Sequence, residues 1–229
     1  MSVIAFVALS FFKLFGRVMF RVDVAWVSEP PEGHWHQTKV GILLNHTSLF
    51  EFLYVTVLPF SFIWKIARTG VFPIADVTAE KKVMGTLLKI LARNVVPLTR
   101  KRDDSWEEFM NHVSDDRLVL MMPEGRMKRL NGLDKYGNPM TVRGGVADVL
   151  EKTNGGRMLV VYSAGLHHVF PPGAVFPRFF KKISAKMESI DIDEYKASLA
   201  REAGHNKFRK LIVEDLERRR DRFCDGIDN

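Results

Sequence analysis

The 229-residue sequence predicts an α/β fold, with a single α/β sandwich domain around a mostly parallel or mixed sheet. Short, continuous apolar runs at residues 40–44 and 118–122 are typical of strands that are buried on both faces. Segments with helical spacing of apolar residues alternate with such runs along the chain. Hydrophobic residues make up 46% of the sequence and charged residues 27%, which is enough apolar material for one sizeable core.

The individual elements follow from spacing and turn residues. Beyond the first helix, Val22, Val24 and Trp26 alternate as in a strand. Further strands are predicted at residues 40–44, 62–66, 95–96, 118–122 and 158–162. Helices are predicted from Ser48 to a point before Pro59, over 78–91 with Thr78 as N-cap, after Asp103 or Asp104, over 145–152, and from Asp193 onward.

The first 20 residues are strongly apolar but lack a basic leader and a small-residue cleavage site. Their uninterrupted apolar part ends at Lys13, short of the ~20 residues that a spanning helix needs. A core helix is one interpretation. The aromatic residues, with basic residues close by, favour a helix that lies in a membrane interface: Phe6, Phe11, Phe12, Phe15 and Phe20, with Lys13, Arg17 and Arg21. We therefore expect a membrane-associating helix over residues 1–21 and a catalytic-type domain over 22–229, with a peripheral or monotopic location on the cytoplasmic face of a membrane.

The net charge of +7 suits an anionic partner such as nucleic acid, an acidic lipid headgroup or a CoA-like molecule. The sequence lacks the aromatic and basic strand pattern of RNA-binding domains, so no nucleic-acid partner is expected. The single cysteine, Cys224, excludes an internal disulfide and fits a reducing compartment. The paired histidines at 34 and 36 and at 167 and 168 lack carboxylate or cysteine residues at ligand spacing, so no metal is expected.

A first group of chemically useful residues follows the strand at 40–44. His46 stands at the strand end, and Glu51 follows five positions later. A carboxylate on one ring nitrogen would fix the tautomer of the imidazole and stabilise its charged form. The other ring nitrogen could then take a proton from a hydroxyl group. This pattern predicts a histidine–carboxylate dyad.

Two further groups follow other predicted strand ends. Glu124, Gly125 and Arg126, with Lys128 close behind, combine a glycine turn with cations that suit a phosphate. Arg100 opens a basic cluster after Pro97. Taken alone, each of these two clusters is also consistent with a charged loop that is exposed to solvent. Because ligands of such sheets lie outside the carboxyl ends of the strands, we expect the three groups to form one site.

Together these segments resemble the glycerolipid (lysophospholipid) acyltransferase family, over roughly residues 40–162. The first family motif is N-H-x-S-x-x-D, which Asn45, His46 and Ser48 match. The third motif, F-P-E-G-T-R or P-E-G-R, is matched by residues 123–126, and residues 97–100 resemble the end of the second motif. The sequence departs from the family where Glu51 replaces an aspartate, Thr99 an acidic residue, and Arg126-Met127 a threonine-arginine pair.

The resemblance implies transfer of a fatty acyl chain from acyl-CoA or acyl carrier protein to a hydroxyl of a lysophospholipid of the lysophosphatidic acid type. His46 would be the general base and Glu51 its orienting group. The substrate-binding residues would be Asn45, Ser48, Arg100, Glu124, Gly125, Arg126 and Lys128. No cofactor is implied beyond the acyl thioester, and a membrane surface is an expected partner. Two alternatives stay open: another acceptor, such as lysophosphatidylethanolamine or an aminoacyl lysolipid, and a catalytically weak lipid-binding relative.

Overall fold

The computed structural model describes residues 2–48, 50–80, 82–91, 94–99, 102–164, 166–171, 174, 176–202 and 207–224. Within this part of the chain, seven strands form one sheet. The strands are β1 (Arg21–Trp26), β2 (Thr38–Leu44), β3 (Gly70–Ala75), β4 (Asn94–Leu98), β5 (Leu118–Met121), β6 (Arg157–Ser163) and β7 (Lys182–Asp191). Their order is β1-β7-β6-β2-β5-β3-β4, and only the β6–β7 pair is antiparallel. The predicted α/β class with a mixed sheet is confirmed.

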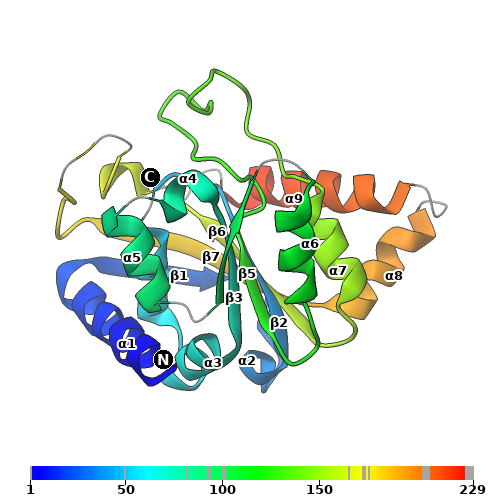
Figure 1. Ribbon diagram of the computed structural model, residues 1–229, viewed down its shortest axis with the longest axis horizontal. Helices are drawn as coiled ribbons and strands as arrows, with labels where there is room; N and C mark the ends of the chain where they lie inside the picture. The colour runs from blue at the N-terminus through cyan, green and yellow to red at the C-terminus, as the bar shows by residue number, and fades with distance from the viewer. Residues whose placement is uncertain are drawn as a thin grey trace.

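Helices cover both faces of the sheet (Figure 1). One face carries α1 (Ser2–Met19), the 3-10 helix η1 (Glu51–Val57), α3 (Phe60–Thr69) and α5 (Lys82–Leu91). The other face carries α6 (Asp104–Asn111), α7 (Gly145–Lys152), α8 (Ile192–Glu202) and α9 (Phe208–Cys224). The shorter helices α2 (His34–Gln37), α4 (Asp76–Ala79) and η2 (Leu166–His168) lie in the connections.

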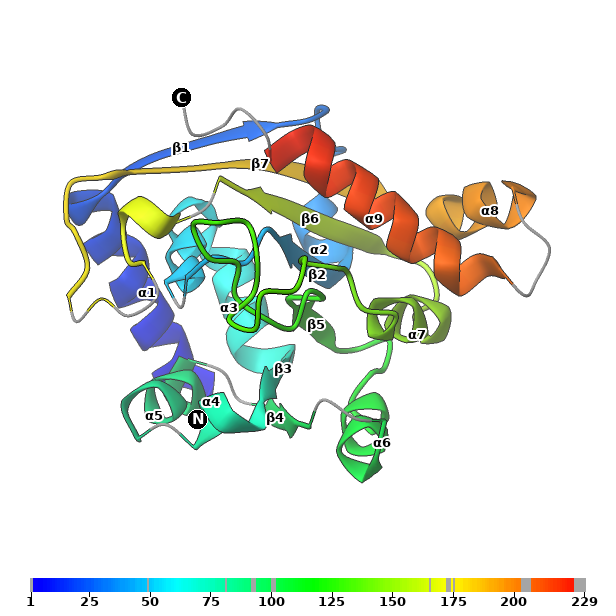
Figure 2. The same cartoon turned by 90° about the horizontal axis from the view of Figure 1, so that it is seen from above.

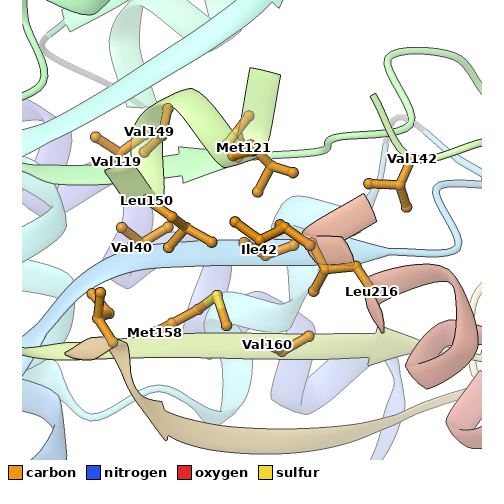
Figure 3. Packing of buried hydrophobic residues seen from close by; sticks show 14 of the residues in the cluster. Val40, Ile42, Val119, Met121, Val142, Val149, Leu150, Met158, Val160 and Leu216 are labelled. Carbon is orange, nitrogen blue, oxygen red and sulfur yellow. The ribbon is translucent and has the colours of Figure 1, made fainter. Parts of the chain in front are cut away.

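The core has two halves, one on each side of the sheet. In the half shown in Figure 3, Val40 and Ile42 of β2 and Met158 and Val160 of β6 point to the same side of the sheet, where Leu216 of α9 also packs. All of these side chains are buried. Alternate residues of a strand face opposite sides of its sheet, so Leu43, which follows Ile42, and Leu159, which lies between Met158 and Val160, pack into the other half. Residues of each continuous apolar run therefore pack into both halves of the core, as expected for strands that are buried on both faces.

The predicted strand at residues 62–66 is wrong, because this segment lies in helix α3. Phe62, Ile63, Ile66 and Ala67 are its buried residues, and this spacing places them on one face of a helix. Pro59 stands at the N-cap, where its fixed φ and missing N–H are tolerated. The strand of this region is β3, which begins directly after α3.

Three other predicted elements differ from those observed. The helix at 78–91 is two helices, α4 and α5, and Thr78 lies inside α4 rather than at its N-cap. The long helix from Asp193 is likewise described as α8 and α9. Strand β7 was not predicted, because Lys186 and Glu188 alternate with the buried residues Ala185 and Met187 and so interrupt its apolar pattern. The Pro97 that was expected to stop a strand lies within β4, which is an edge strand, where proline is tolerated.

Helix α1 packs one face against the domain, with a buried lysine in it, and exposes apolar residues on the opposite face. Its buried residues are Ala5, Leu9, Lys13 and Gly16. The ammonium of Lys13 donates to the carbonyl oxygens of Thr56 and Leu58, at 2.9 and 2.6 Å, and so caps the end of η1. The exposed large apolar residues of the helix are Val3, Ile4, Val7, Phe11, Leu14 and Val18.

This arrangement corrects the expected exposure of the aromatic residues of this segment. Phe11 is exposed, whereas Phe20 is buried and Phe6, Phe12 and Phe15 are half-buried against the domain. Phe6, for example, packs edge-to-face on Trp64 of α3. The exposed stripe of α1 is therefore mainly aliphatic. The division of the chain at residue 21 stays a prediction.

Gly16 allows the close approach of α1 to η1 and gives a test of this packing. A Cβ at Gly16 would lie 2.5 Å from Oγ1 of Thr56. Replacing a glycine inside a helix by alanine ordinarily stabilises a protein by ~0.5–1 kcal/mol. Here we expect Gly16→Ala to lower the unfolding temperature, because η1 must move away from α1. Thermal unfolding followed by circular dichroism measures this change.

Thr56→Ala provides the matched control in a double-mutant cycle, because it removes the atom that the new methyl group meets. Gly16→Ala should be less destabilising in the Thr56→Ala background than in the wild type. A higher unfolding temperature for Gly16→Ala alone would contradict the close contact.

Candidate functional site

The site begins where β2 ends. Asn45 has a left-handed backbone conformation with φ of 63°, which asparagine adopts more readily than most residues. Its side-chain amide donates to the carbonyl oxygen of Ser163, at the end of β6, at 2.8 Å. This bond fixes the turn beside the neighbouring strand. The turn places His46 just outside the carboxyl edge of the sheet.

Glu51, the first residue of η1, lies beneath this turn and is buried. Its Oε1 accepts hydrogen bonds from the backbone N–H groups of Thr47, at 2.6 Å, and Ser48, at 3.0 Å. Its Oε2 lies 2.5 Å from Nδ1 of His46. The predicted contact between this histidine and carboxylate is confirmed. The catalytic roles of the two residues stay predictions.

The surroundings of His46 favour its charged form. Burial of the imidazole lowers its pKa, but the charge and hydrogen bond of Glu51, with the charge of Glu124, outweigh burial and raise the pKa. The side chain of His46 is 13% exposed, whereas that of Glu51 is fully covered. With Nδ1 turned to Glu51, Nε2 lies on the opposite side of the ring. The arrangement suits a base that works through Nε2 and is stabilised once it has taken a proton.

A second buried carboxylate, Glu124, holds the backbone of the same histidine. Glu124 follows β5, and its Oε2 accepts the backbone N–H of His46 at 2.8 Å. Its Oε1 accepts from Nη1 of Arg220 in α9, at 3.2 Å. Arg220 also donates to the carbonyl oxygen of Met140. Both oxygens of Glu124 are therefore engaged within the protein, and this side chain positions His46.

Gly125 and Lys128 complete the turn after Glu124. Gly125 has a φ of 64°, a conformation that glycine adopts without strain. The backbone N–H of Lys128 donates to the carbonyl oxygen of His46 at 2.7 Å. Its ammonium lies 3.3 Å from Oδ1 of Asn45. Lys128 thus links the Pro-Glu-Gly-Arg turn to the turn that follows β2.

Arg126 is held by a residue that was not predicted. Its Nη1 donates to Oδ2 of Asp134, whose side chain is buried in the loop of residues 124–140. Burial raises the pKa of Asp134, but hydrogen bonds from the backbone of Asn138 and from Arg126 hold it well below its usual range. The guanidinium also lies over the ring of Tyr136. Among the described residues, Nε of Arg126 is buried without a hydrogen-bond partner.

Two predicted site residues, Ser48 and Arg100, remain to be placed. Ser48 is used within the protein, since its hydroxyl donates to the carbonyl oxygen of Phe170 and accepts from the N–H of Phe50. Arg100 lies outside the described residues. Thr99, where the second motif usually has an acid, bonds through its hydroxyl to Asp103. The loop that carries Arg126 projects beyond the strand ends at the top of Figure 1.

Two residues of the site escaped prediction for physical reasons. Arg220 reaches Glu124 across 96 positions of sequence, and a run of three arginines in a helix is ordinarily a solvated face. Asp134 lies in a turn-rich loop, where an aspartate usually bonds only its own backbone. The spacing of charges around such a turn could have suggested Asp134. No local pattern identifies Arg220.

A cavity of about 470 Å³ opens beside His46 and extends along the face of the sheet that α1, η1, α3 and α5 cover. At its polar part, His46, Arg126, Arg129 and Lys135 line it. The rest is apolar, with lining residues from α1, η1, α3, β3 and α5. Its size is within the range of small-molecule sites, about 300–1,000 Å³. The cavity can hold a long apolar group with a charged end near His46.

Within the described residues, no group of three or more histidine, cysteine, aspartate or glutamate side chains is arranged to hold a metal ion.

No protein-family model and no curated protein matches the chain. Among solved structures, the chain is similar to the 1-acyl-sn-glycerophosphate (LPA) acyltransferase PlsC from Thermotoga maritima, with a TM-score of 0.54. The two sequences are 18% identical over 93% of this chain and 79% of that chain. The chain therefore has the fold of this acyltransferase.

Proposed function

We propose that the protein is an acyltransferase that moves a fatty acyl chain from a thioester donor to a hydroxyl of a lysophospholipid. The observation that carries this proposal is the His46–Glu51 contact, at 2.5 Å, beside a mostly apolar cavity. The shared fold supports it, because the similar structure is described as an LPA acyltransferase. The donor is acyl-CoA or acyl carrier protein.

In the proposed reaction, Nε2 of His46 takes the proton of the acceptor hydroxyl. The hydroxyl oxygen attacks the thioester carbonyl, and the C–S bond breaks as the new ester forms. The imidazolium returns its proton to the leaving thiolate. Glu51 keeps the ring in the required tautomer and stabilises its positive charge. A thioester is already activated, so a positioned base suffices without a covalent intermediate on the protein.

The apolar and the polar part of the cavity suit different parts of the two substrates. The apolar part suits a fatty acyl chain, which gains about 0.8 kcal/mol for each CH₂ group that is removed from water. The phosphate of the acceptor suits the polar part, where Arg129 and Lys135 line the cavity beside Arg126. The guanidinium of Arg126, which Asp134 holds in place, lines the same part of the cavity. Lys128 lies next to this region, through its contact with Asn45.

Helix α1 supports an action at a membrane surface. Although its uninterrupted apolar stretch ends at Lys13 and was expected to be too short, Ser2–Met19 as a whole is long and apolar enough to cross a membrane, judged by length and composition alone. One of its faces packs against the domain, with Lys13 buried, and the opposite face exposes six large apolar residues. Such a one-sided helix fits the interface of a bilayer, with its apolar face among the lipids. Membrane docking through α1 therefore belongs to the proposed function.

The proposal is tested by mixing purified protein with acyl-CoA or acyl carrier protein and a panel of lysolipids, and analysing the lipids by mass spectrometry. We expect an acylated phospholipid, with lysophosphatidic acid as the preferred acceptor. Preference for lysophosphatidylethanolamine or an aminoacyl lysolipid would change the acceptor but keep the reaction. Lipid binding without product from any donor and acceptor would identify a catalytically weak relative and refute the proposal.

The pH dependence of the reaction should report the pairing of His46 with Glu51. A base works unprotonated, so kcat/KM rises with pH through the pKa of His46. Because Glu51 helps to raise this pKa, the midpoint should lie above the ordinary histidine value of about 6.5. Glu51→Gln removes the charge, so we expect the midpoint to move to lower pH and kcat to fall at least about tenfold.

Glu51→Asp is the matched control, because it keeps the charge and shortens the side chain by one methylene group. Its midpoint should stay near that of the wild type, while kcat falls because the shorter side chain reaches Nδ1 less well. An unchanged midpoint in Glu51→Gln would show that this carboxylate does not act on the catalytic base.

The role of Arg126 can be separated from its structural bond to Asp134. A charge-assisted hydrogen bond to phosphate contributes ~1.5–3 kcal/mol, so Arg126→Ala should raise KM for the lysolipid roughly ten- to a hundredfold. The value of kcat should change little if the contact is equally strong in the ground and transition states. Steady-state kinetics with varied acceptor and varied donor measure both constants.

Asp134→Asn serves as control, because it keeps the oxygen that accepts from the backbone of Tyr136 and Asn138 but loses the charge that holds Arg126. If Arg126 only fixes the loop, both variants should raise KM alike. If Arg126→Ala weakens only the acyl donor, this cation belongs to the donor site and its assignment to the acceptor is wrong.

A further inference from the structure

The segment of residues 176–182, which leads into β7, exposes three phenylalanine side chains. Phe176 is 80% exposed, Phe180 69% and Phe179 43%. Phe180 also has a left-handed backbone conformation, with φ of 61°, which is uncommon for an aromatic residue. Large apolar side chains that lie together on a surface commonly mark a site of interaction. Neither the cavity nor the His46 site uses these side chains.

The segment is fixed against the end of α1. The N–H of Phe180 donates to the carbonyl oxygen of Met19 at 2.7 Å. The ring of Phe179 lies 6.2 Å from that of Phe15, edge to face, and 6.0 Å from that of Phe20. Figures 1 and 2 both show this segment, in yellow, beside the C-terminal end of α1 at one edge of the molecule. The segment with the exposed phenylalanines therefore adjoins the end of α1 at which the exposed apolar residues stop, at Val18.

Basic residues surround the junction of the two segments. Arg17, Arg21, Arg178, Lys181 and Lys182 are all exposed there. One carboxylate is close, since Asp23 lies 3.0 Å from the ammonium of Lys182. The backbone N–H of Arg21 donates to the carbonyl oxygen of Lys181, so the strand that leaves α1 and the segment run together. The charge at this edge of the molecule is therefore positive.

We propose that residues 176–182 form a second membrane-contacting element, which docks with α1 on a bilayer that carries anionic headgroups. Phe176 and Phe180 enter the boundary between headgroups and acyl chains, and the surrounding cations contact the headgroups. This inference rests on the proposed docking of α1, to which it adds a second contact and a preference for negative charge. Two contacts at the same edge also fix the rotation of the domain on the membrane.

Vesicle binding tests the proposal without any acyl transfer. The full chain is sedimented with vesicles of phosphatidylcholine alone, or of phosphatidylcholine with phosphatidylglycerol. We expect Phe176→Ser with Phe180→Ser to weaken binding to both kinds of vesicle at least about tenfold, since both side chains lose their apolar contact. Lys181→Gln should weaken binding about fivefold, and only to the anionic vesicles. Leu130→Ser is the matched control, because Leu130 is equally exposed but lies on the loop beyond the strand ends.

A comparison with α1 separates this inference from the proposed docking of the helix. Val7→Ser with Leu14→Ser alters only the exposed face of α1. If this variant loses binding while Phe176→Ser with Phe180→Ser binds like Leu130→Ser, the second contact is refuted and the docking of α1 stands. If the wild type fails to bind either kind of vesicle, both are refuted. Acyl transfer with soluble short-chain substrates tests the reaction independently of both.

A second readout keeps the test valid if the paired phenylalanine variant does not fold, which circular dichroism would reveal. Phe176→Trp places a fluorescent reporter at the exposed position. Brominated phosphatidylcholine in the vesicles should quench its fluorescence beyond the quenching of the wild-type tryptophans. Equal quenching in both proteins would overturn the proposal. A change of oligomeric state in the paired variant, with vesicle binding unaltered, would assign the surface to a protein contact instead.

Discussion

The burial of one carboxylate, that of Glu51, is the constraint on which the site depends. A charged group without access to water is costly unless hydrogen bonds satisfy it. Glu51 meets this requirement with the N–H groups of Thr47 and Ser48 and with the ring of His46. The two backbone bonds fix the loop after β2, and the third bond fixes the imidazole. Glu51 is one methylene group longer than the aspartate of the related motif. In this packing it nevertheless contacts the histidine in the way that the motif requires.

The same histidine is held from its backbone by a second buried carboxylate, which brings a distant helix into the site. Glu124 accepts the N–H of His46 and is neutralised by Arg220. Arg219, the neighbour of Arg220, bonds Glu188 of β7 and Asp215 of α9 itself. These bonds of Arg219 anchor α9 to the sheet. Arg220, which contacts Glu124, is the next residue along the helix. Helix α9 is part of the framework that positions His46, although its sequence resembles a solvated charged helix.

The sequence predicts those features that local patterns determine. The contact between His46 and Glu51 spans five positions and follows a continuous apolar strand, so its geometry could be predicted. Residues 62–66 were misassigned because a short apolar run fits a buried helix as well as a strand. Strand β7 alternates buried Ala185 and Met187 with the charged residues Lys186 and Glu188, and so short an alternation is a weak signal. The contacts of Arg220 and the shape of the cavity depend on tertiary packing between distant segments, which no local pattern encodes.

The claim that His46 is the base of an acyl transfer is tested most directly by a single-turnover measurement. Excess protein, as wild type or His46→Ala, is mixed with acyl-CoA and lysophosphatidic acid, and product lipid and intact protein are followed by mass spectrometry. General base catalysis contributes typically about 10²- to 10⁴-fold, so the variant should form product slower by that factor, with no acylated protein in either case. An unchanged rate in His46→Ala, or an acyl group that passes through the protein, would contradict the account.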